Sequence, residues 1–191
     1  MSADETLRAR IRLIPSADGS RHHLLHPLNG RFQPVDHAAL DALLHALAPR
    51  IDARGVDYVL GFPEGGSIPA YAFARLIHRP VILASRLPLQ MPRIVRFEQP
   101  GARLGTTQYV YGIEPGQRVL LFEDELTTGH TAVNAARALR QAGVQIDQVA
   151  TLLLIDHPAL RQRLAAEGLT LHVGLTLPPE YAPRPQDDGA E

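Results

Sequence analysis

The chain has 191 residues, of which 45% are hydrophobic, and carries a formal net charge of −1 at pH 7. This length suits a single domain with a sizeable core, and the balanced charge gives no reason to expect nucleic acid or an anionic membrane as a partner. The chain has no cysteine, and all 19 basic residues are arginine, which excludes disulfides, thiolate catalysis, lysine Schiff bases and the lysine of a Walker-type phosphate loop.

The first 34 residues combine a charged start with a histidine-rich stretch. Residues 1–12 favour a short helix and are not signal-like, and no apolar run approaches the roughly 18 residues that cross a membrane, so we expect a cytoplasmic protein. His23 and His26 have a His-x-x-His spacing, which invites a metal site, but no other ligand is apparent nearby and Pro27 would break a helix that aligned them. The alternative is a loop or short hairpin that lies over a site.

The next segment has the pattern of a helix followed by a βαβ unit. Between Val35 and Ala53, leucines and Ile51 recur at close to 3.6 residues, which predicts an amphipathic helix with Asp36 as its N-cap. Short apolar runs then predict strands at 58–60 and 81–84, and between them a tight loop (61–66) and a helix (67–76). Residues 85–117 are rich in arginine, proline and glycine without a sustained period; their best strand candidate is 108–111. A stretch of this kind inside a compact domain is often functional.

The most informative stretch runs from Arg118 to Gly143. An apolar strand, 119–122, stops at Glu123 and Asp124; a loop of threonines and glycine follows, and then an alanine-rich helix. The N–H groups and the dipole of a helix N-terminus bind anions. The two carboxylates repel an anion and instead suit hydroxyl groups or a divalent cation. A phosphorylated sugar has both features.

The rest of the chain continues the alternation of strands and helices. Apolar runs predict strands at 149–155 and 171–175 with a short helix, 159–167, between them, and residues 181–191 are expected to be a disordered tail. Alternating elements of this kind indicate an α/β fold with a doubly wound, mainly parallel sheet flanked by helices. In such sheets ligands bind at the carboxyl ends of the strands, where residues 61–66, Arg86, residues 123–131 and Asp156 are all expected.

The stretch FEDELTTGHT resembles the signature of the type I phosphoribosyltransferases. GFPEGGS is similar to the pyrophosphate loop of that family, and the arginine-rich segment 86–112 occupies the place of its mobile catalytic loop. YVYG (109–112) resembles adenine phosphoribosyltransferases, whereas the segment IDHPALRQRLAAEGLTLHVGLTL resembles orotate phosphoribosyltransferases. The resemblance implies one domain, 1–180, with a small hood drawn largely from 12–34 and 168–180.

The resemblance also implies a donor, phosphoribosyl pyrophosphate with Mg²⁺, and roles for individual residues. Glu123 and Asp124 would bind the ribose hydroxyls as catalytic residues, with Asp124 a candidate metal ligand, and Arg86 would neutralise the leaving pyrophosphate. The loop around the 5-phosphate would comprise Thr127, Thr128, Gly129, His130 and Thr131. The backbone of Glu64, Gly65 and Gly66 would hold the pyrophosphate, and the mobile loop would add one or more of Arg93, Arg96 and Arg103.

The acceptor implied by the resemblance is a nucleobase, and a purine is slightly favoured over orotate. The orotate-type enzymes place arginine where this chain has His157, although the chain also lacks the arginine that adenine-type members carry in the pyrophosphate loop. The family implies a homodimer. The alternative function is a catalytically inactive sensor of the donor with the same fold. A response-regulator receiver is disfavoured because its acids would lie near the N-terminus and it needs a lysine, and a dinucleotide-binding domain is disfavoured because no GxGxxG follows an early strand.

Overall fold

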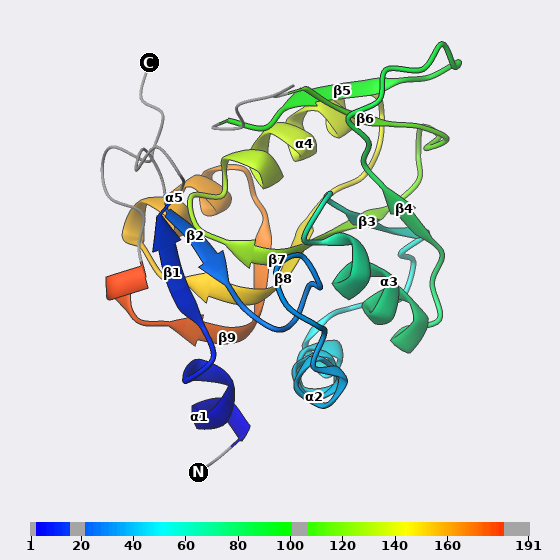
Figure 1. Ribbon diagram of the computed structural model, residues 1–191. Coiled ribbons are helices and arrows are strands. Elements are labelled where there is room, and N and C mark those ends of the chain that lie inside the picture. The colour runs from blue at the N-terminus through cyan, green and yellow to red at the C-terminus, as the bar shows by residue number, and fades with distance from the viewer. Residues whose placement is uncertain (1–2, 16–21, 101–106, 182–191) are drawn as a thin grey trace.

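A five-stranded parallel sheet forms the centre of the computed structural model, which describes residues 3–15, 22–100 and 107–181 (Figure 1). In the order β4-β3-β7-β8-β9, the strands are Val81–Leu83, Tyr58–Gly61, Val119–Leu126, Gln148–Ile155 and Thr170–Leu177. Strand β3 is hydrogen-bonded to β4 on one side and to β7 on the other. The chain therefore reverses its direction across the sheet between these strands, and a crevice opens at the carboxyl ends of strands at such a switch point.

Helices cover both faces of the sheet. Helices α2 (His37–Leu47) and α3 (Ser67–Leu76) pack on one face, and α4 (His130–Gln141) and α5 (Pro158–Ala166) pack on the other. Successive residues of a strand point to opposite faces, so Phe122 stacks on Phe73 of α3, with ring centroids 4.9 Å apart, whereas Leu121 enters the core beneath α4. This arrangement confirms the doubly wound α/β fold.

The N-terminal segment forms a small substructure, which we call the hood. It consists of the short helix α1 (Ala3–Arg8), an antiparallel hairpin of β1 (Arg12–Pro15) and β2 (His22–Leu25), and the turn segment 26–34 that follows. The hairpin that was one of the alternatives for this region is thus confirmed. The turn after β2 reaches the carboxyl end of β7, where Asn29 contacts Asp124.

Most of residues 168–180, which were expected to contribute to the hood, lie in the central sheet, where the sequence also predicts a strand at 171–175. Residues 170–177 form β9, which pairs with β8 from Gln148↔Thr170 to Ile155↔Leu177. Leu175 and Leu177 are buried in the core, so this edge strand belongs to the sheet. A 3₁₀ turn, η2 (Pro179–Tyr181), follows, and Tyr181 packs against the same core, so the expected tail begins too early by at least one residue. Residues 182–191 lie outside the described residues.

The arginine-rich segment contains more regular structure than the sequence predicts. Strands β5 (Val95–Glu98) and β6 (Thr107–Val110) pair as an antiparallel ribbon that lies along α4 in Figure 1. Val95 and Phe97 are buried while Arg96 and Glu98 are exposed, which is the alternation of a strand with one covered face. Among the residues that the structure describes, no helix combines the length and hydrophobicity that a bilayer crossing requires.

Candidate active site

The loop between β7 and α4 has the geometry of an anion site. The strand does not stop at the two acids as predicted, because Glu123 and Glu125 continue the ladder with β8 opposite Thr151 and Leu153. The turn follows at 127–129, and Gly129 precedes α4 with a φ of 74°, a left-handed conformation that glycine adopts without strain. Arg163 of α5 donates a hydrogen bond to the carbonyl of Thr128. The hydroxyl-rich loop therefore lies against the start of a twelve-residue helix, which favours a phosphate group.

The loop between β3 and α3 forms the facing wall. A Cβ atom at Gly66 would lie 2.7 Å from the carbonyl oxygen of Phe62, so this tight turn requires glycine. The peptide bond between Pro63 and Glu64 is cis. Two arginines flank Glu64: Arg86 donates to its Oε1 at 3.4 Å, and Arg31 Nη2 lies 3.7 Å from its Oε2. This pair of guanidinium groups gives the wall positive charge.

These segments enclose one pocket of about 190 Å³. Most of the predicted donor-binding residues line it: Glu64, Gly65, Arg86, Glu123, Asp124, Thr127, Thr128, Gly129 and Thr131. Gly66 and His130 lie immediately beside this set, at the starts of α3 and α4, but do not line the pocket. Of the pocket residues that the sequence did not predict, Arg31 is the most notable because it brings charge from the hood. Their chemical roles stay predictions.

The arginines predicted for the mobile loop lie elsewhere. Arg93 pairs with Glu114, and Arg96 is exposed on β5 opposite Tyr109. Neither lines the pocket. The physical reason is that residues 95–98 are committed to a strand whose buried face packs on α4, so Arg96 points away from that packing. Arg103 lies outside the described residues.

The two acids of the signature differ in their electrostatic surroundings. Glu123 and Asp124 are only 9% and 6% exposed. Burial, together with the charges of Asp124 and Glu125, raises the pKa of Glu123 well above its usual value. Burial also opposes ionisation of Asp124, but the hydrogen bonds from His26 and Asn29 and the charge of His26 outweigh it and lower the pKa of Asp124. Divergent pKa values of neighbouring acids are typical of catalytic sites.

The partners of Asp124 come from the hood. Asn29 donates from Nδ2 to Asp124 Oδ2 at 2.8 Å, and His26 Nε2 lies 3.4 Å from the same oxygen and 3.6 Å from Glu125 Oε2. Burial alone would lower the pKa of His26, but the nearby carboxylates of Asp124 and Glu125 raise it to about 9. The sequence did not predict either contact.

The same cluster offers ligands for a divalent cation. Donor atoms of His26, Asp124 and Glu125 all lie within 4.8 Å of one another. His26 Nε2 faces the carboxylates of Asp124 and Glu125 at 3.4 and 3.6 Å and therefore carries a proton, so His26 is a poor metal ligand. Glu125 Oε2 is buried and has no hydrogen-bond partner among the described residues. The two carboxylates therefore fit Mg²⁺, which prefers oxygen ligands and commonly takes one or two carboxylates together with substrate phosphates.

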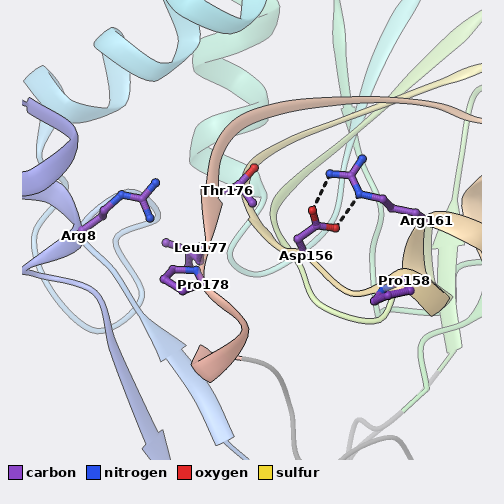
Figure 2. Close-up of a pocket in the computed structure, with 7 residues that line it drawn as sticks. All are labelled: Arg8, Asp156, Pro158, Arg161, Thr176, Leu177 and Pro178. Carbon is purple, nitrogen blue, oxygen red and sulfur yellow. Dashed lines mark hydrogen bonds and ion pairs between the residues drawn. The ribbon is translucent and has the colours of Figure 1, made fainter.

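Asp156 does not join this pocket, contrary to the prediction that four strand ends converge. Its carboxylate accepts hydrogen bonds from Nε and Nη2 of Arg161 at 2.6 and 2.9 Å. The pair borders a separate cavity of about 640 Å³. Residues 176–178 and, on the other side of them, Arg8 also line this cavity (Figure 2). The physical reason is local, because Arg161 lies five residues further on, in the first turns of α5, and captures the carboxylate.

Comparison with known proteins gives a consistent result. Residues 35–170 match the family described as the phosphoribosyl transferase domain. The chain is 32% identical over 173 residues to an adenine phosphoribosyltransferase of Chelativorans sp. (strain BNC1), covering 88% of this chain and 92% of the relative. It is 25% identical over 166 residues to a hypoxanthine/guanine phosphoribosyltransferase of Methanohalophilus mahii, covering 86% of both chains. The crystal structure of adenine phosphoribosyltransferase from Rhodothermus marinus superimposes with a TM-score of 0.67 and 25% identity, over 92% of this chain and 98% of that one.

Proposed function

The chain belongs to the type I phosphoribosyltransferase family and is an enzyme of that class. We propose that it transfers the 5-phosphoribosyl group of phosphoribosyl pyrophosphate to a nucleobase and releases pyrophosphate. The observation that carries the proposal is the single pocket lined by the β3–α3 loop, the acidic end of β7 and the threonine loop. Its walls match the three parts of the donor: pyrophosphate, ribose and 5-phosphate.

Each wall contributes a distinct interaction. The threonine loop and the start of α4 bind the 5-phosphate through backbone N–H groups and hydroxyls. Asp124, kept ionised by its partners, accepts hydrogen bonds from the ribose hydroxyls and stabilises the positive charge that develops on the ribose as pyrophosphate departs. Arg86 and Arg31 exchange their contacts with Glu64 for the pyrophosphate oxygens. Asp124 and Glu125, together with the donor, would hold Mg²⁺, which when bound would neutralise charge on the leaving group.

A purine is the proposed acceptor. The relatives described above are named for adenine and for hypoxanthine and guanine. The position that would hold an arginine for the carboxylate of orotate is His157, which caps α5 by accepting a hydrogen bond from the N–H of Ala159 at 3.2 Å. An imidazole engaged in this way is a poor receptor for a carboxylate.

The proposal is tested by measuring pyrophosphate release with phosphoribosyl pyrophosphate, Mg²⁺ and each of adenine, hypoxanthine, guanine, xanthine, orotate and uracil. We expect turnover with at least one purine and none with orotate. Calorimetry with the donor alone provides the second measurement. Tight donor binding without turnover on any base would contradict the enzymatic proposal and favour the donor-sensing function.

We also propose that two copies associate through the face that carries α3 and the segment after β4. This face exposes large apolar side chains, among them Tyr71 at 54% and Leu87 at 60%, and Ile68 and Tyr71 border a groove of about 630 Å³ between α2 and α3. Exposed apolar area on this scale favours a protein partner. Sedimentation equilibrium should give the mass of a dimer, and Tyr71→Glu should shift the mass towards the monomer; a wild-type monomer at micromolar concentration would contradict the proposal.

A further inference from the structure

Two buried side chains of the turn after β2 converge on one oxygen of the catalytic acid. Asn29 Nδ2 and His26 Nε2 lie 2.8 and 3.4 Å from Asp124 Oδ2. His26 is 1% exposed and Asn29 is 5% exposed, so water cannot replace either donor. These contacts join residues that are 95 or more positions apart in the chain.

The turn itself fixes the direction of both side chains. The N–H of Leu28 donates to His26 Nδ1 at 3.3 Å, and the N–H of Arg31 donates to Asn29 Oδ1 at 3.0 Å. In both residues the accepting atom is thus tied to the backbone of the turn, and the donating nitrogen is left to face Asp124. This repeated arrangement orients the imidazole and the amide towards Asp124, with Asn29 Nδ2 and His26 Nε2 3.2 Å from each other.

The carboxylate is confined from the other side as well. A side chain at Gly65 would overlap the Asp124 carboxyl group, so the pyrophosphate loop packs directly on it. Asp124 therefore lies between the hood turn and the pyrophosphate loop, with polar donors on one side and a glycine backbone on the other. A group held in this way keeps its geometry without help from the ligand.

We propose that His26 and Asn29 are positioning residues that hold the Asp124 carboxylate in its working orientation, so that docking of the hood sets the geometry of the donor pocket. This inference rests on the proposed function only where it is tested by measuring kcat. The hood then acts on catalysis through Asp124, in addition to any contact that it makes with the acceptor. Neither side chain needs to touch the donor.

The direct test compares variants that remove or keep the donor N–H. Asn29→Ala and His26→Leu should lower kcat by about 100-fold, the cost of a displacement near 1 Å, with a smaller change in the KM for the donor. His26→Gln places an amide nitrogen close to the position of Nε2 and should recover most of the lost rate. Arg54→Gln, a change at a side chain that is 93% exposed, is the control and should leave kcat unchanged. Thermal unfolding of each variant shows whether the fold persists.

A double-mutant cycle separates positioning from general stabilisation. If Asn29 acts through Asp124, Asn29→Ala should cost little further rate in a protein that already carries Asp124→Asn. Additive losses, or a His26→Gln variant as slow as His26→Leu, would overturn the inference. If the wild-type protein turns over no base, the proposed function fails. The same double-mutant cycle is then measured as donor affinity by calorimetry, or as the free energy of unfolding if the donor does not bind. Additive effects of the two substitutions in that measurement would overturn the inference independently of the proposed function.

Discussion

Replacement of Gly65 by alanine tests how closely the β3–α3 loop packs on Asp124, the proposed catalytic acid. The new methyl group would overlap both oxygens of the Asp124 carboxylate. The carboxylate cannot move freely because Asn29 and His26, both buried, contact Oδ2, the oxygen that the new methyl group would approach most closely. A shift of about 1 Å is needed to relieve the overlap, and a misplacement of that size can cost about 100-fold in rate. We therefore expect kcat to fall by about this factor.

The assay is pyrophosphate release at saturating donor and purine, with donor affinity measured in parallel by calorimetry. Gly168→Ala is the control: its φ is +62° and no atom lies within 4 Å of the added Cβ. The control should lose about 1 kcal/mol of stability from the left-handed backbone but keep its turnover. If Gly65→Ala keeps kcat within a few-fold of wild type, the β3–α3 loop does not confine Asp124 as closely as the structure indicates.

Three further predictions concern other parts of the account. Asp124→Asn should lower kcat by about 100-fold or more; activity within a few-fold of wild type would show that the negative charge of Asp124 does not contribute to turnover. Arg86→Ala should weaken donor binding by about tenfold, whereas Arg54→Ala, at a side chain that is 93% exposed, should not, and equal affinities for the two variants would contradict the role of Arg86. Asp36 caps α2 by accepting from the N–H of Ala39 at 3.0 Å, so Asp36→Ala should cost about 1 kcal/mol at pH 7. The same bond and the Arg10 partner lower the pKa of Asp36, so this difference should be present above pH 3.8 and shrink as the pH falls through the lowered value; a urea-unfolding difference that is constant with pH would contradict the assignment.

The sequence predicted the central elements well because their signals are local. Helix α3 begins and ends at the predicted residues, Ser67 and Leu76, and Asp36 caps α2 as expected. Apolar runs of three to seven residues predicted the sheet strands, since buried parallel strands need apolar side chains on both faces. The strand ends at β3 and β7 then placed most of the signature residues in one pocket.

The errors share a physical origin in contacts that are remote in the chain. Strand β7 passes beyond its acids because β8 supplies hydrogen bonds opposite Glu123 and Glu125, although charged residues ordinarily end a buried strand. The strand predicted at 171–175 extends to 170–177 because it pairs with β8 along its whole length. His26 and Asn29 flank the buried pair Pro27-Leu28. The local sequence can indicate a buried turn here, but it does not predict that the turn contacts Asp124, which is 95 residues away from Asn29.

The proposed reaction in this pocket is the transfer of a phosphoribosyl group to a base. Chromatography of a reaction that contains the protein, phosphoribosyl pyrophosphate, Mg²⁺ and adenine or another purine measures it most directly. We expect nucleoside 5-monophosphate and pyrophosphate to form in equal amounts, and Asp124→Asn to remove most of the yield of both products. Pyrophosphate without nucleotide, or the same nucleotide yield from the variant, would contradict it.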